Sequence, residues 1–134
     1  MFVYHHKVHY YETDRMGVTH HSNYIRFMEE ARIAYLDTVG ASYVQIEADG
    51  IISPVIRVEG KFVHTTTFDD MLDVEVFVQS MTTFKLKLGY IIRCRGEVVF
   101  EGSSLHCFLD KAGTPLPIDD YYPQLRPQRQ EPAI

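Results

Sequence analysis

An aspartate, a glycine and a histidine stand at a spacing that could serve acyl transfer. Asp14, Gly17 and His21 occur in the stretch YETDRMGVTHHSNY, directly before a segment with apolar residues at helical spacing. The first N–H groups of a helix have no partner within it and lie at the positive end of its dipole. Such donors can stabilise an oxyanion while a nearby carboxylate attacks the same carbonyl carbon or activates water there. Glycine would let the intervening loop turn sharply.

A purely structural role fits the same residues. Asp14 could cap a turn, and His20 and His21 could be solvated loop residues. Asn23 could be no more than a helix cap, because its side chain can accept a hydrogen bond from the first turn. Spacing alone does not separate this alternative from a site for acyl transfer.

A long helix must position the end of this stretch. Apolar residues at i, i+3, i+4 and i+7 predict an amphipathic helix from Tyr24 to about Leu36. Ser22 or Asn23 is expected to cap its start, and Gly40 to end it, since glycine tolerates the left-handed conformation found at helix ends. One face of this helix should be buried.

Strands are expected before and after two helices. Residues 2–10 read as a first strand, and 42–49 as a short helix in which Ser42 and Gln45 have capping-box spacing. After Gly50 the apolar period changes from near 3.6 to 2, which predicts strands in succession. Their expected ranges are 51–68, 72–82, 84–95 and 97–109. Reversals are expected at Asp69-Asp70 and at Arg95-Gly96-Glu97.

This order predicts an α+β fold in which the long helix packs on a curved antiparallel sheet of about five strands. With 134 residues the chain should form a single domain, 1–134. Residues 122–134, which are rich in proline, are expected to form a loose or surface-lying tail. Apolar residues on both faces of some strands, such as Phe77 and Val99, favour a homo-oligomer, with scatter within a monomer as the alternative.

Composition excludes several classes of protein. The net charge of −5 argues against a broad nucleic-acid-binding surface. No segment approaches eighteen uninterrupted apolar residues, and the first residues, MFVYHHKVHYYETD, lack the apolar run of an export signal, so we expect neither a transmembrane helix nor secretion. Cys94 and Cys107 are expected to be reduced thiols of a cytoplasmic protein.

No metal site is expected. The sequence contains no CxxC pair, and on one strand His5 and His9 would lie about 13 Å apart, too far to share an ion with His6.

The stretch YYETDRMGVTHHSNYIRFMEEAR resembles the N-terminal signature of the hotdog-fold thioesterases of the 4-hydroxybenzoyl-CoA thioesterase type, which include the acyl-CoA thioesterases associated with the Tol-Pal system. Asp14, Gly17, His21, Asn23 and Tyr24 match that signature in order and spacing. The likeness continues through GIISPVIRVEGKFVHTTTFDDMLDV and covers most of residues 3–110.

The resemblance implies a hotdog fold and hydrolysis of an acyl-CoA thioester to the acid and free CoA, with no metal or redox cofactor. It implies a homo-oligomer, either a dimer or a homotetramer formed as a dimer of dimers, with sheets joined edge to edge and active sites at the subunit interface. By position, Asp14 would be the catalytic nucleophile or general base. The backbone N–H of His21 would bind the thioester oxygen, and its side chain would assist.

Four further positions carry expected substrate-binding roles by the same resemblance. Tyr10 matches an aromatic position that lines the site, Gly17 lies in the turn, and Asn23 and Tyr24 shape the start of the helix. Thr19, His20 and Ser22 depart from the residues frequent in relatives, which bears on acyl specificity. Lys61, Lys85 and Lys87 are candidates to meet the phosphates of coenzyme A, although strand lysines are commonly a solvated face.

Three alternative functions remain open at this point. The thioester carrier could be acyl carrier protein, although the acidic chain disfavours an acidic partner. A hotdog protein could also bind acyl-CoA without hydrolysing it, but such a protein would be expected to lack the carboxylate at Asp14. Hydratase or dehydratase chemistry on the same fold would need a catalytic histidine with a differently placed carboxylate and its own loop, which the sequence does not contain.

Overall fold

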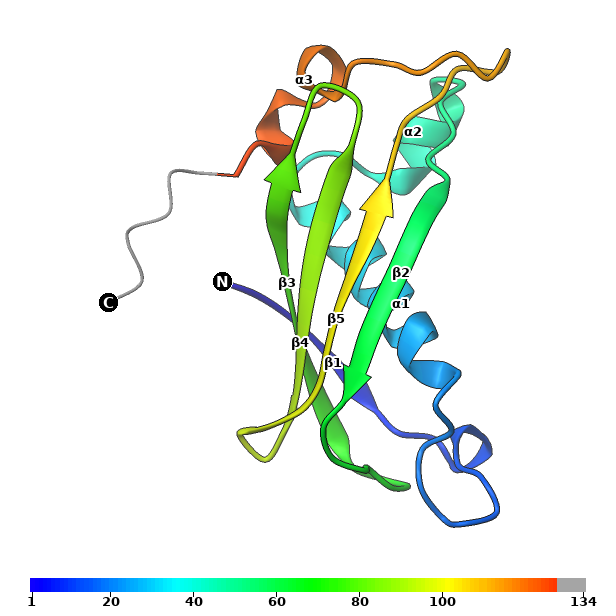
Figure 1. Ribbon diagram of the computed structural model, residues 1–134, viewed down its shortest axis with the longest axis vertical. Coiled ribbons are helices and arrows are strands. Elements are labelled where there is room, and N and C mark those ends of the chain that lie inside the picture. Colours follow the sequence, from blue (N-terminus) through cyan, green and yellow to red (C-terminus); the bar gives the residue numbers. More distant parts are fainter. Residues whose placement is uncertain (128–134) are drawn as a thin grey trace.

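The computed structural model describes residues 1–127 of the chain, and these form an α+β fold (Figure 1). The residues expected at the far end of the tail, 128–134, lie outside the described part. The elements in chain order are β1 (Phe2–Lys7), the 3-10 helix η1 (Tyr10–Glu12), α1 (Asn23–Thr38), α2 (Tyr43–Ala48), β2 (Val55–Phe62), β3 (Met71–Met81), β4 (Leu86–Cys94), β5 (Glu97–His106), α3 (Ile118–Tyr121) and the 3-10 helix η2 (Pro123–Leu125).

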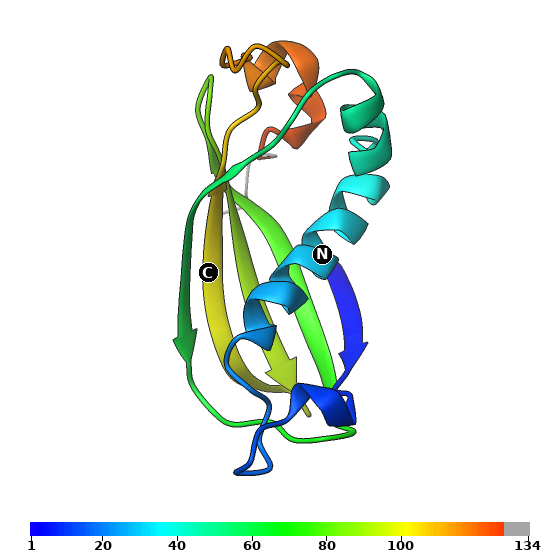
Figure 2. The same cartoon turned by 90° about the vertical axis from the view of Figure 1, so that its right-hand side faces the viewer.

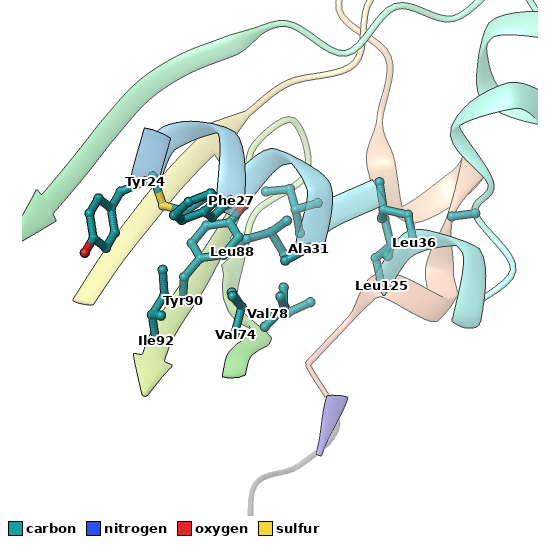
Figure 3. Close-up of a cluster of buried hydrophobic side chains, with 14 of the residues drawn as sticks. Tyr24, Phe27, Ala31, Leu36, Val74, Val78, Leu88, Tyr90, Ile92 and Leu125 are labelled. Carbon is teal, nitrogen blue, oxygen red and sulfur yellow. The ribbon is translucent and has the colours of Figure 1, made fainter. Parts of the chain in front are cut away.

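The five strands make one antiparallel sheet in the order β1-β3-β4-β5-β2, and α1 lies across one of its faces (Figure 2). The buried face of α1 carries Phe27 and Ala31, both fully buried, which point toward Leu88 and Tyr90 of β4 (Figure 3). Burying a large apolar side chain contributes about 1.5–3 kcal/mol, so this contact holds the helix on the sheet. The expected helix-on-sheet architecture is confirmed.

The start of α1 is fixed differently from the expected cap. Neither Ser22 nor Asn23 caps the helix through its side chain: the Ser22 hydroxyl pairs with Nδ1 of His20 at 2.8 Å, and Asn23 Nδ2 donates to the backbone oxygen of Glu12 at 2.8 Å. The amide of Asn23 therefore ties the helix to η1. The expected end is confirmed, since Gly40 has a φ of +75°.

Of two other local expectations, one is wrong and one is confirmed. The capping box at Ser42 is wrong, because its side chain makes no cap hydrogen bond and the Gln45 amide instead pairs with Asp49. The hairpin turn between β4 and β5 is confirmed, since Arg95 and Gly96 both have positive φ values of 51° and 80°, as a tight hairpin requires.

The long strand expected over 51–68 is shorter in the structure. β2 spans Val55–Phe62, and the chain then leaves the sheet to form the loop 63–70, which includes Asp69 at a φ of +73°. That departure matters for function, because the loop reaches the stretch around Asp14.

The first residues of the expected tail pack against the core and do not lie loosely on the surface. Leu125 is fully buried and Tyr122 is 8% exposed, so both belong to the hydrophobic core. The prolines limit regular structure there but do not prevent single apolar side chains from packing. Within residues 1–127, no helix is both long and apolar enough to cross a membrane.

The apolar residues on both faces of the strands have a local cause. At Val99 the pairing of β4 with β5 shifts register between Ile92 and Arg93, and this bulge lets Val99 and Phe100 both be buried. Phe77 lies over Gly89, where an added Cβ would meet its ring at 2.5 Å. These two positions therefore give no argument for a partner subunit.

Candidate active site

Asp14 closes a tight turn that directs one carboxylate oxygen at its own loop. Its Oδ1 accepts the backbone N–H of Met16 at 2.8 Å and that of Val18 at 3.4 Å. Gly17, at a φ of +81°, supplies the left-handed residue of this turn and donates its N–H to the Asp14 carbonyl at 3.0 Å. The other oxygen, Oδ2, has no hydrogen-bond partner among residues 1–127. The turn thus fixes the carboxylate and leaves one oxygen available.

The start of α1 offers a free backbone donor. Hydrogen bonds from Asn23 N to His20 O (3.0 Å) and from Tyr24 N to His21 O (3.2 Å) extend the helical turn backward beyond Asn23. Within the described part of the chain, the N–H of His21 has no acceptor. It is therefore a donor of the kind that an oxyanion needs, next to the positive end of the helix dipole.

A pair of threonines joins the Asp14 loop to the loop after β2. Thr19 N donates to Thr66 O at 2.8 Å, and the hydroxyls of the two residues lie 2.6 Å apart. The phenol of Tyr24 reaches the Thr66 hydroxyl at 2.9 Å, and its ring stacks on Phe100 at 5.0 Å between centroids. Burial raises the pKa of the Tyr24 phenol, so this group is a neutral hydrogen-bonding and packing residue.

These contacts enclose a pocket of about 260 Å³. Asp14, Met16, Val18, Thr19, His21 and Tyr24 line it from the N-terminal stretch, and Phe62, Val63, His64 and Thr65 from the end of β2 and its loop. Asp14, His21 and His64 therefore line one hollow together with several apolar residues. The set can hold a carbonyl group next to an apolar substituent and can activate water against it.

The structure brings three of the six expected site residues to the pocket wall. These are Asp14, His21 and Tyr24. Gly17 serves the turn without lining the pocket, and Asn23 is buried and bound to Glu12. Tyr10 is 77% exposed and meets Phe68 edge-on at 5.5 Å, outside the pocket lining.

Sequence reasoning missed the second wall of the pocket. Phe62, Val63, His64 and Thr65 lie more than forty positions beyond Asp14. No local pattern predicts that the loop carrying them pairs with Thr19 through Thr66, which depends on the chain leaving the sheet after Phe62. Their signal in the sequence is the polar run HTTT, which follows the alternating strand VIRVEGKF and Val63.

A separate hollow of about 360 Å³ lies on the face of the sheet away from α1. Lys61 and Lys87, two of the lysines considered for phosphate contacts, line it together with Glu59 and Glu101. Two carboxylates and two ammonium groups line it, so this hollow has no net positive charge to attract a phosphate.

Comparison with known families places the chain among the thioesterase-like superfamily, whose model matches residues 8–126. A curated relative from Bacillus subtilis, named "Putative acyl-CoA thioesterase YneP", is 31% identical over 106 residues, which cover 78% of this chain and 77% of that protein.

Two solved structures have closely similar folds. A hypothetical protein from Aquifex aeolicus is 27% identical with a TM-score of 0.89, covering 94% of this chain and all of that one. The DHNA-CoA thioesterase from Staphylococcus aureus is 29% identical with a TM-score of 0.85, covering 90% of this chain and 83% of that one. The hotdog thioesterase fold implied by the sequence resemblance is confirmed.

Proposed function

The chain belongs to the thioesterase-like superfamily, and from that premise we propose that it hydrolyses acyl-CoA thioesters to a carboxylic acid and free CoA. The observation that carries the proposal is the pocket that Asp14 and His21 both line, together with the absence of an acceptor for the N–H of His21 within residues 1–127. The named activities of the Bacillus subtilis and Staphylococcus aureus relatives support the same reaction.

The proposed chemistry begins at the thioester carbonyl carbon. The carbonyl oxygen accepts the N–H of His21, which stabilises the negative charge that develops there. Oδ2 of Asp14 either attacks the carbon directly, to give an anhydride that water then opens, or takes a proton from the attacking water. The C–S bond breaks, and the sulfur leaves as a thiolate that takes up a proton. The imidazoles of His21 and His64 are the pocket groups able to supply it.

We further propose that a second copy of the chain pairs with β2. This strand is at one edge of the sheet, and all of its residues are exposed. Four large apolar side chains stand on it: Val55 at 44% exposure, Ile56 at 49%, Val58 at 38% and Phe62 at 55%. An exposed edge with unpaired backbone groups and apolar side chains favours pairing with another strand. Because Phe62 also lines the pocket, the active site would lie at that interface, in a dimer or a dimer of dimers.

The proposed location of the reaction is the cytoplasm. Cys94 and Cys107 are both free thiols, which is typical of proteins in a reducing compartment. Oxidation to a disulfide is thus not needed to hold this fold.

A panel of short, long and aromatic acyl-CoA thioesters tests the proposal through release of free thiol. Turnover of at least one acyl class is expected, and the preferred class identifies the acyl group. Tight binding across the panel without thiol release would contradict hydrolysis and would favour a binding protein.

A further inference from the structure

A cluster of two histidines and a glutamate lies at the end of β1, outside the pocket. The strand ends at Lys7, and the turn into η1 brings His9 and Glu12 back to His6. One nitrogen or oxygen atom from each of these three residues lies within 4.8 Å of the other two. Two imidazoles and a carboxylate form a donor set that zinc commonly binds in proteins.

The expectation of no metal rested on His5 and His9 sharing one strand, and that geometry does not apply to this cluster. His9 follows the end of β1, and His5 points elsewhere, with Nδ1 at 2.7 Å from Asp73 Oδ1. Glu12, which the sequence argument did not consider as a ligand, takes the place of His5.

His6 is held between two carboxylates. Its Nε2 lies 2.8 Å from Oε1 of Glu12, and its Nδ1 lies 3.3 Å from Oε2 of Glu30. The Nε2 contact is a buried hydrogen bond, and Glu12 Oε1 also accepts the backbone N–H of His9 at 2.7 Å. An ion at this point would replace the hydrogen bond between His6 and Glu12. The imidazole proton would then lie on Nδ1, next to Glu30, and the lone pair of Nε2 would bind the ion. A carboxylate on the far nitrogen is also the usual outer partner of a metal-binding histidine.

The distances require only local adjustment to admit an ion. Ligand atoms around a tetrahedral zinc, with bonds of about 2.0–2.1 Å, are about 3.3 Å apart. The gap between His6 and Glu12 is slightly shorter than this, and the His9 ring must move closer to both. His9 is exposed, and its ring lies edge-on to His6 and stacks on Tyr11. Its exposure also leaves the fourth position open to water.

We propose that His6, His9 and Glu12 bind one divalent transition-metal ion, with zinc as the preferred ion. The site is structural and does not depend on the proposed hydrolysis.

The position of Glu12 links this site to the rest of the N-terminal region. Its backbone oxygen accepts the N–H of His20 and the side-chain amide of Asn23, each at 2.8 Å. An ion on the Glu12 carboxylate therefore holds η1, and through it the start of α1. Because the ion binds the folded chain and not the unfolded one, it should raise the melting temperature.

Co²⁺ titration of the chelator-treated full chain tests the site, with Zn²⁺ as competitor. We expect one equivalent of Co²⁺ to bind with the visible absorption of a tetrahedral ion, Zn²⁺ to remove that absorption, and Zn²⁺ to raise the melting temperature. His9→Asn should weaken binding at least about tenfold and abolish the thermal shift. His5→Asn is the matched control, since it removes a neighbouring exposed histidine outside the cluster, and it should bind as the wild type does.

His9 is exposed, so its variant should fold normally, and far-ultraviolet circular dichroism checks this. The proposal is overturned if the wild type binds no stoichiometric Co²⁺, or if His9→Asn binds as tightly as the wild type. Equal weakening in His5→Asn, or loss of binding in His20→Asn alone, would place the ion elsewhere and would also overturn it.

Discussion

Asp14 and Asp110 close two turns of the same construction at opposite ends of the molecule (Figure 1). Each Oδ1 accepts the backbone N–H groups two and four residues further on, and each turn has a glycine at the third position, Gly17 at +81° and Gly113 at +84°. Asp14, unlike Asp110, lines the pocket next to a free backbone donor. The same turn therefore occurs at two places in this chain and does not by itself indicate catalysis. The surroundings of Asp14 are what distinguish this aspartate chemically from Asp110.

The role of His21 should reside mainly in its backbone. Replacing His21 with Ala keeps the N–H and should lower kcat by less than about tenfold. Replacing it with Pro removes the N–H two residues before the helix begins, and should lower kcat by about 10²- to 10³-fold, as loss of an oxyanion donor does. Steady-state kinetics on both variants checks this. An equal loss in the two variants would assign the role to the imidazole.

The β2 edge should control the oligomeric state. Ile56→Lys places a charge on the apolar edge and should shift the protein toward monomer, because pairing would bury the new ammonium group. Val44→Lys is the matched control, since Val44 is 79% exposed on α2. Sedimentation velocity over a range of concentrations measures the shift. A wild type that remains monomeric at all concentrations would refute the proposed pairing.

Acid should destabilise the fold through His106. This residue is 3% exposed, and its Nε2 lies 2.6 Å from the Ser104 hydroxyl. Burial, with the charge of Arg32 as a second cause, lowers the pKa of His106 from 6.5 to about 4. The unfolded chain therefore binds one more proton than the folded chain between pH 6.5 and 4, and stability falls as the pH falls through this window.

The expected loss from His106 is about 2 kcal/mol of unfolding free energy between pH 7 and pH 5. Urea unfolding of the wild type and of His106→Gln at pH 7 and at pH 5 isolates the contribution of His106 to the unfolding free energy, because the carboxylates contribute equally to both proteins. The stability advantage of the wild type should shrink by that amount on acidification. A constant difference would show that His106 titrates normally.

Periodicity predicted the elements of this fold better than their ends. The helix expected from Tyr24 begins at Asn23, since a buried stripe is a strong local signal. The cap expected at Ser22 is wrong because its hydroxyl pairs with His20, and the cap expected at Ser42 is wrong because its side chain makes no cap hydrogen bond; the spacing of the residues shows neither. The burial of Leu125 was missed because one apolar residue among prolines has no period.

In the candidate site, too, the residues close together in the sequence were predicted and the distant ones were missed. Asp14 and His21 lie close together along the chain, so one stretch of sequence suggested both. His64 and its neighbours reach the pocket through the pairing of Thr19 with Thr66, a contact across 47 residues. Contacts between distant loops follow from the tertiary fold, and a single sequence does not encode them in a readable pattern.

Thiol release by Asp14→Asn and Asp110→Asn tests the central claim most directly. In either variant the amide oxygen can still accept the two N–H groups of its turn, so both should keep the fold, which thermal unfolding verifies. Asp14→Asn should lower kcat on the preferred acyl-CoA by about 10²- to 10⁴-fold, whereas Asp110→Asn should hydrolyse it at the wild-type rate. Unchanged hydrolysis by Asp14→Asn would contradict the assignment of Asp14 as the catalytic carboxylate.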